Sequence, residues 1–296
     1  MLINNEFNEQ KIQSPLQYIW SIFRNKSIAV MSMWAVVTLI IIIIFCHYII
    51  PYPPSLQHPN MLLLPPYWAD GSEQAHLLGT DDLGRDTFSR LLKGVQLTLS
   101  GALLITLVIS ILGIIIGATA ALTQGIKASV LHHFLDALLA IPTLLTALIL
   151  IVLLGMSFEN SLLAVSLSLL PQFIRGIYIC IESELNKQYL IALRLDGATN
   201  IRLLRFGILP NIIEPLVTLL NRSFTMAILE ITTLGFLGFG ANMEEIELGV
   251  LISQNLDLVY LSPYLVLFPG LAIFIIIIIF NVFSEGIRHA VIEGEE

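Results

Sequence analysis

The stretch IAVMSMWAVVTLIIIIIFCHYII, residues 28–50, decides the fold class, because it holds no Asp, Glu, Lys or Arg. An apolar run of 18 or more residues is long enough to cross the roughly 30 Å hydrocarbon core of a bilayer as an α-helix. Helices suit this environment because their backbone groups hydrogen-bond within the segment. The run follows a polar lead, residues 1–27, and is too long for the apolar part of a cleavable signal peptide, so we interpret it as a retained transmembrane helix.

The composition of the whole chain extends this prediction to an integral membrane protein. Its 296 residues are 56% hydrophobic and only 12% charged, whereas a soluble domain carries about 25% charged residues. We therefore predict an all-α integral membrane protein with six transmembrane helices, and we expect Pro142 to bend the third of them. The five further spans are expected at residues 98–122, 134–154, 159–181, 211–236 and 262–283.

The distribution of Lys and Arg predicts the orientation, because loops on the cytoplasmic side are enriched in these residues. Ten of them lie in the lead, in residues 123–133, in residues 175–210 and in the tail, whereas three lie in the loop 51–97. Both termini and the loop 182–210 are therefore predicted to be cytoplasmic. The other outer loop, residues 237–261, has no Lys or Arg and carries four carboxylates: Glu244, Glu245, Glu247 and Asp257.

No arrangement of side chains in the sequence points to catalysis. No glycine is followed by lysine, so the chain lacks a P-loop for ATP. The HExxH and G-x-S-x-G strings are also absent. The net charge of −8 argues against a nucleic-acid partner, since phosphate binding needs a basic surface. We expect a non-enzymatic membrane subunit with no catalytic residues, no metal ligands and no cofactor of its own.

The loop 182–210 carries a helix–turn–helix pattern. Residues 184–196 have helical propensity, and Gly197 suits the left-handed position that ends a helix. Asn200 is expected to cap a second short helix over residues 201–206, before Leu209 and Pro210 lead into the fifth span.

An apolar stripe is expected along the first of these two helices. Leu185, Tyr189, Ala192 and Leu193 recur at helical spacing. An exposed stripe of this kind needs either the membrane surface or a groove on a cytoplasmic partner to cover it, and the pattern alone fits both.

This loop also resembles a known element. The string YLIALRLDGATNIRLLRFGILPN at 189–211 resembles the EAA loop of ABC importer permeases, with the glycine of that loop at Gly197 and its Leu-Pro at Leu209 and Pro210. Of the EAA triplet only Ala192 is present, because Ile191 and Leu193 replace its other two residues.

Further strings narrow the resemblance to peptide permeases. LGTDDLGRDTFSRLLKG at 78–94, LGFLGFGA at 234–241 and LFPGLAIFIIIIIFNVFSEGIR at 267–288 resemble the C-type permeases of dipeptide and oligopeptide systems. Within this branch, four strings resemble the permeases of Sap systems, which are named for sensitivity to antimicrobial peptides. They are LLPPYW at 63–68, LHHFLDALLAIPTLL at 131–145, IALRLDGAT at 191–199 and MAILEITTLGFL at 226–237.

The resemblance implies a type I importer permease core in spans two to six, preceded by one extra span, in the inner membrane of a bacterium. The implied organisation is a cytoplasmic lead (1–27), a transmembrane helix (28–50), a periplasmic loop (51–97), the core (98–290) with its coupling loop (182–210), and a tail (291–296). The implied partners are a second permease of the Sap type, two ATPase subunits that bind ATP and Mg²⁺, a periplasmic peptide-binding protein, and membrane lipid.

The resemblance also implies roles for particular residues. The ATPase would dock against the loop, and the residues expected there are Tyr189, Ala192, Leu193, Asp196, Gly197, Leu209 and Pro210. Two charges inside the fifth span, Arg222 and Glu230, are candidates for the translocation pathway, because charge within a membrane faces a cavity or a partner by default. The alternative is that both pair with neighbouring helices or reach an interface.

The cargo implied by the resemblance is a peptide, including cationic antimicrobial peptides whose removal would contribute to resistance. Glu230 would suit such a cationic cargo. The same family also implies an alternative, the export of a polyamine such as putrescine. Two other classes of function remain: a secondary transporter that works without an ATPase, and a membrane scaffold.

Overall fold

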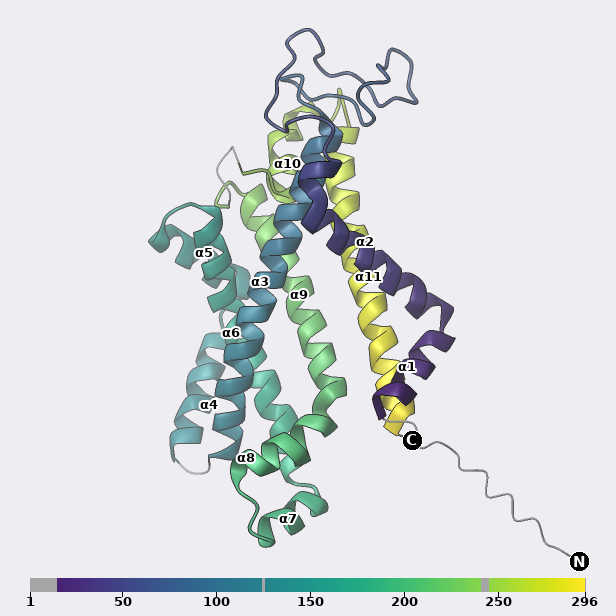
Figure 1. Cartoon of the computed structure of the whole chain (residues 1–296). Helices are drawn as coiled ribbons and strands as arrows, with labels where there is room; N and C mark the ends of the chain where they lie inside the picture. Colours follow the sequence, from purple (N-terminus) through teal and green to yellow (C-terminus); the bar gives the residue numbers. More distant parts are fainter. Residues whose placement is uncertain (1–14, 124–125, 241–244, 296) are drawn as a thin grey trace, which may run out of the picture.

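The computed structural model describes residues 15–123, 126–240 and 245–295, and this part of the chain is a set of long helices with no β-strand (Figure 1). Five of the helices are long and apolar enough to cross a membrane. A sixth span is obtained when the bent pair α4 and α5 is taken as one. The prediction of an all-α membrane protein with six spans is confirmed in this form.

Three elements follow the expected spans with changes at their ends. They are α2 (Ser27–Ile49), α3 (Thr87–Leu122) and α6 (Phe158–Leu185). The largest change is in α3, which begins eleven residues before the predicted span. It begins there because the Asp86 carboxylate caps it, accepting a hydrogen bond from the Ser89 amide at 2.8 Å. At about 1.5 Å per residue, α3 is longer than the hydrocarbon core is thick.

The third span is broken into two helices, α4 (Ile126–Leu139) and α5 (Thr143–Leu154), whose axes meet at 88°. Pro142 causes the break, because proline lacks an amide donor and keeps the preceding residue out of the helical conformation. The bend expected at Pro142 is therefore a full corner, and the expected span 134–154 is two separate helices.

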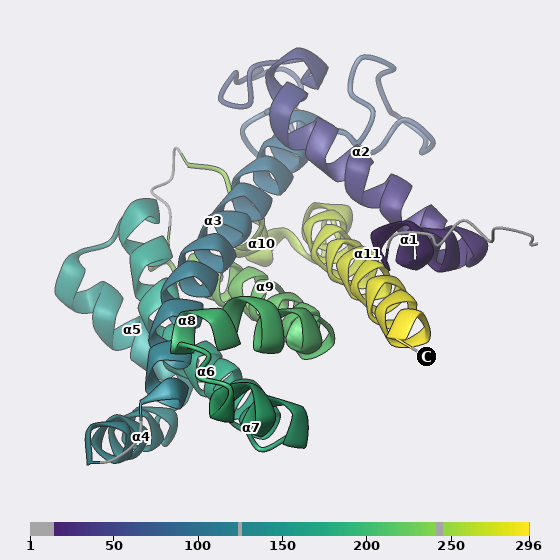
Figure 2. The same cartoon turned by 60° about the horizontal axis from the view of Figure 1, so that its bottom comes forward.

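The last two spans also differ from the predicted ranges. The helix α9 (Ile213–Phe236) is preceded by a π-helical turn, Leu203–Ile208, and a 3₁₀ turn, Leu209–Ile212. The helix α11 (Tyr264–Glu295) continues through residues 284–295, beyond the predicted span. Its extension packs against α1 (Pro15–Asn25): Ala290 and Phe23 are buried in one small cluster. Figure 2 shows α1 and α2 lying along one side of α11, away from α6.

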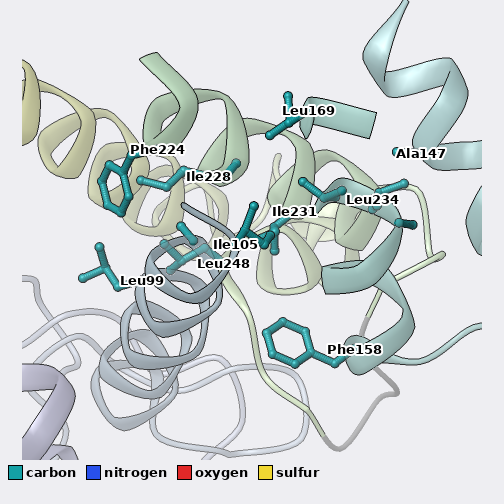
Figure 3. Packing of buried hydrophobic residues seen from close by; sticks show 14 of the residues in the cluster. Leu99, Ile105, Ala147, Phe158, Leu169, Phe224, Ile228, Ile231, Leu234 and Leu248 are labelled. Atoms are coloured by element: carbon teal, nitrogen blue, oxygen red, sulfur yellow. The ribbon is translucent and has the colours of Figure 1, made fainter. Parts of the chain in front are cut away.

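The main core lies where α3, α5, α6 and α9 meet a short helix, α10 (Leu248–Gln254). Figure 3 shows Leu99, Ile105, Ile228 and Leu248 gathered at this point. A glycine permits the close packing of α3 on α6, since a Cβ added at Gly113 would lie 2.4 Å from the Phe173 ring. This core holds together the helices that carry the candidate sites.

Candidate functional site

The loop 182–210 forms one end of the molecule, and we call it the coupling-loop end (Figure 1). The single helix expected over residues 184–196 is wrong, because α6 ends at Leu185 and α7 (Gln188–Leu195) begins after two intervening residues. The second short helix is also different. It is α8 (Asn200–Arg202), followed directly by the π-helical turn.

The turn between α7 and α8 has the geometry expected for a glycine stop. Gly197 has φ of +82°. The Ala198 amide donates to the Leu193 carbonyl and the Gly197 amide donates to the Arg194 carbonyl, both at 3.1 Å, which is the Schellman pattern. Asn200 is not the cap of the next helix, because the Thr199 hydroxyl accepts the hydrogen bond from the Arg202 amide.

The apolar stripe expected on this helix is exposed, and a different residue faces inward. Tyr189, Ala192 and Leu193 are exposed, whereas Leu190 is only 2% exposed and packs against the inner cluster. The break after Leu185 resets the helical phase, so spacing counted from Leu185 selects the wrong face. If one continuous helix is assumed, Leu190 is therefore not identified as the buried residue.

A polar network fixes α7 to its neighbours. The Tyr189 hydroxyl donates to the Glu184 carboxylate, and the Lys187 ammonium pairs with the same carboxylate at 2.7 Å. The Asn211 amide donates to the Tyr189 oxygen at 3.0 Å and to the Gly207 carbonyl at 2.7 Å. Burial and the adjacent Glu184 raise the pKa of Tyr189 to about 12. The network links α6, α7 and the 3₁₀ turn that precedes α9.

The sequence reasoning named Tyr189 but missed its partners Glu184 and Asn211. Tyr189 and Asn211 lie 22 positions apart, and no periodic pattern connects them. A buried carboxylate at the end of a span was the available signal, since Glu184 is 4% exposed and needs partners there.

Large apolar side chains are exposed around this network. Leu195, Ile201 and Phe206 are 83%, 79% and 70% exposed. Of the other residues expected here, Asp196 and Pro210 are exposed, and Leu209 packs against the inner cluster. Large exposed apolar side chains on α7, α8 and the π-helical turn are typical of a surface that another body covers.

Arg222 and Glu230, the two charges within α9, lie in different surroundings. Glu230 is 4% exposed, and one of its carboxylate oxygens accepts a hydrogen bond from the Ser168 hydroxyl on α6 at 2.9 Å. Thr143, at the start of α5, lies close to the same carboxylate. Arg222 instead lines a cavity of about 280 Å³ between α6 and α9, next to Leu139 of α4. The structure does not bring the two charges to one site.

A larger cavity of about 950 Å³ lies between the start of α2, the first half of α9 and the second half of α11. Its cations have acidic partners: Arg288 pairs with Glu214 and Glu285 at 3.4 and 2.6 Å. Lys26 pairs with Glu293 at 2.6 Å. The charges at this cavity are therefore compensated within the chain.

The outer loop 237–261 is less acidic at its surface than its composition suggests. Glu247 is fully buried and caps α10, accepting hydrogen bonds from the Gly249 and Val250 amides at 3.1 and 2.8 Å. Burial raises the pKa of Glu247 to about 7. Asp257 is exposed, and Glu244 lies outside the described residues. In the ranges 15–123, 126–240 and 245–295, no three His, Cys, Asp or Glu side chains are arranged to hold a metal ion.

Comparison with known proteins gives the family. Residues 109–293 match the family model "Binding-protein-dependent transport system inner membrane component", and residues 14–66 match "N-terminal TM domain of oligopeptide transport permease C". The chain is 40% identical to the peptide transport system permease protein SapC of Escherichia coli O6:H1, over 100% of both chains. It is 37% identical to the dipeptide transport system permease protein DppC of Escherichia coli K12, over 94% of this chain and 92% of that one.

A solved structure supports the fold. The inward-facing methionine ABC transporter MetNI has a chain similar to this one with a TM-score of 0.58 and 17% identity, covering 69% of this chain and 97% of that chain. This likeness concerns the fold alone. Together with the family match, it identifies a multi-pass protein of the bacterial inner membrane. The chain belongs to the inner-membrane component family of binding-protein-dependent transport systems.

Proposed function

We propose that this chain is the permease subunit of a peptide ABC transporter and that its cargo includes cationic antimicrobial peptides. The observation that carries the proposal is the coupling-loop end, where Leu195, Ile201 and Phe206 are exposed and a polar network fixes α7 to α6 and to the turn before α9. The SapC and DppC relatives, which are permeases of a peptide and a dipeptide transport system, support peptides as the cargo.

In this proposal the work is divided among several subunits. Two ATPase subunits bind ATP and Mg²⁺ and dock on α7 and α8 from the cytoplasm, where both termini of this chain also lie. A second permease of the Sap type completes the pathway, and a periplasmic peptide-binding protein delivers the cargo. This chain supplies no catalytic residue.

The mechanism follows from the connections of α7. When ATP binding closes the ATPases, α7 moves with the surface on which it docks. Because Tyr189 joins Glu184 on α6 to Asn211 before α9, the displacement passes to two membrane-spanning helices. The core then switches between two states as a rigid body, driven by different contacts in each.

The test compares two glycines with the same backbone geometry at opposite ends of the molecule. Gly197 and Gly238 have φ of +82° and +81°, and a Cβ added at either meets no atom within 4 Å. Each ends a helix with the same pair of turn hydrogen bonds. Gly197→Asp places a charge on the proposed docking surface, whereas Gly238→Asp introduces the same backbone strain far from it.

The measurement is ATP-dependent peptide movement in proteoliposomes that hold the complete assembly. We expect Gly197→Asp to abolish transport while the assembly remains inserted, and Gly238→Asp to retain most of it. Transport that persists in Gly197→Asp would refute the docking assignment. Transport that runs without ATP would favour a secondary transporter instead.

A further inference from the structure

The cavity between α6 and α9 presents hydrogen-bond donors and positive charge without an acidic residue among its lining side chains. Arg175 and Gln172 come from α6, and Arg222 and Ser223 come from α9. Leu139 of α4 and Leu219 of α9 add apolar wall. A guanidinium group has five donors and no acceptor, so this lining is matched to an anion.

The two arginines differ in how their charges are compensated. The Arg175 guanidinium lies 3.7 Å from the Asp136 carboxylate. Arg222 is exposed and, within the described part of the chain, makes no ion pair or hydrogen bond, although it lies nine residues into a membrane-spanning helix. That position is about 13 Å along α9. A charge so placed in a membrane is costly unless a partner or water meets it.

In the larger cavity beside α11, by contrast, the chain compensates its own cations. There Arg288 and Lys26 both have carboxylates of the same chain within 3.4 Å. The uncompensated Arg222 is therefore a feature of one cavity and not of the whole membrane region. In the membrane, water or a group from outside this chain would have to compensate it.

We propose that this cavity binds the C-terminal carboxylate of a peptide as it crosses the membrane. The proposal rests on the peptide-transport function above and adds a chemical feature to its substrate. Arg pairs with a carboxylate through two parallel hydrogen bonds, which gives both strength and orientation. A volume of about 280 Å³ has room for several waters or for one terminal residue. A polyamine, which carries only positive charge, would be repelled here.

The test uses one fluorescent peptide in two forms, with a free C-terminal carboxylate and with a C-terminal amide. Equilibrium binding is measured on the membrane assembly of permeases and ATPases, without the soluble binding protein, so that the latter's own preference is not measured. We expect the wild-type assembly to bind the free acid about tenfold more tightly, the effect of losing one charge-assisted hydrogen bond.

Three variants make the result specific. Arg222→Gln is expected to weaken binding of the free-acid peptide and to leave binding of the amide unchanged, so that the two affinities become equal. Arg222→Lys is expected to keep part of the preference for the free acid. Arg24→Gln, an exposed arginine on α1 outside the cavity, is expected to keep all of it. Equal affinities for the two peptides in the wild type would overturn the proposal. If Arg222→Gln weakens the binding of both peptides, or if the assembly is lost, the proposal is overturned and Arg222 instead pairs with an acidic residue of a partner subunit.

ATP-driven uptake of the same two peptides separates this inference from the function on which it rests. A tenfold binding preference without ATP-driven uptake would leave the carboxylate site standing and refute the transport function. ATP-driven uptake with no preference between acid and amide would support the transport function and refute the site.

Discussion

The two ends of this molecule differ in the polar contacts that they bury and in the partners that we propose for them. At the end formed by residues 51–90 and α10, which we call the proline-loop end, several buried charged side chains have partners within the chain. His76 Nδ1 lies 2.8 Å from the Asp86 carboxylate, and Arg90 donates to the Gln254 side chain at 2.7 Å. The coupling-loop end exposes Leu195 and Ile201, and the proline-loop end also exposes large apolar side chains, among them Tyr67 and Trp68.

The two ends differ instead in that one contains a buried cluster of paired charges and the other contains the surface on which we propose that the ATPase docks. Buried polar groups that are fully paired specify one arrangement, because leaving any of them unpaired is costly. Exposed apolar groups specify nothing until another surface covers them. The proline-loop end is therefore expected to respond to substitution through the stability of the chain, and the coupling-loop end through assembly and turnover.

The largest expected loss of stability is at Gly249, in the proline-loop end. A Cβ at this position would lie 1.9 Å from the backbone oxygen of Thr232, which has no flexible end that could move away. We expect Gly249→Ala to lower the free energy of unfolding by more than about 3 kcal/mol, which exceeds the usual cost of overpacking. Thermal unfolding of the purified chain in detergent measures it.

Gly270→Ala is the matched control for this substitution. It also places alanine inside a helix, but its Cβ meets nothing within 4 Å. The control should be neutral or stabilise the chain by up to about 1 kcal/mol. Equal losses in both variants would show that the contact at Thr232 is not the cause.

A second prediction compares two leucines of α7. Leu190 is 2% exposed and Leu195 is 83% exposed. Leu190→Ala is expected to cost about 2–5 kcal/mol, since it leaves a cavity in the inner cluster. Leu195→Ala is expected to change stability by less than about 0.5 kcal/mol but to lower the amount of ATPase that purifies with the permease. A Leu195→Ala variant as unstable as Leu190→Ala would contradict the comparison.

Sequence patterns predicted the membrane class and the family because apolar run length and fixed strings are local properties. They placed α2 almost to the residue and put a glycine stop at Gly197, whose turn has the expected geometry. They failed where distant contacts decide the structure. Glu184 and Asn211 meet through Tyr189 across a break in the helix, and the surroundings of Arg222 and Glu230 depend on which helices pack against α9.

A third prediction concerns pH at the proline-loop end. Burial raises the pKa of Glu247 to about 7, against about 4.3 in an unfolded chain. Between these values the folded state holds a proton that the unfolded state has lost, so stability falls as pH rises from about 4.5 to 7 and levels off above. Glu247→Gln should flatten this slope. The loss of stability that it removes between pH 4.5 and 7 is on the order of 1–3 kcal/mol, and thermal unfolding scans measure it.

The exposed Asp257 provides the control for the pH experiment. Asp257→Asn removes a carboxylate from the same outer loop without changing a buried group. It should leave the slope of stability against pH between 4.5 and 7 as in the wild type. An unchanged slope in Glu247→Gln would show that another group titrates in this range.

Among the substitutions that are expected to destabilise the chain, Tyr189→Phe has the smallest effect, and it tests the coupling-loop end. Tyr189→Phe removes the hydroxyl that joins Glu184 to Asn211, at a cost of about 1 kcal/mol. Because this network connects α7 to two spans, we expect faster amide exchange in α7 and less transport per ATP hydrolysed, with the proline-loop end unchanged.

Tyr260→Phe is the matched control, since Tyr260 is 98% exposed at the other end.

The two ends should also differ in their response to pH. With a folded-state pKa of about 12, Tyr189 keeps its proton, so its contact persists at every pH at which Glu247 titrates, and stability is lost through it only between about pH 10 and 12. Coupling that is undisturbed in Tyr189→Phe would show that the Tyr189 hydroxyl is not needed to transmit movement from α7 to the membrane helices.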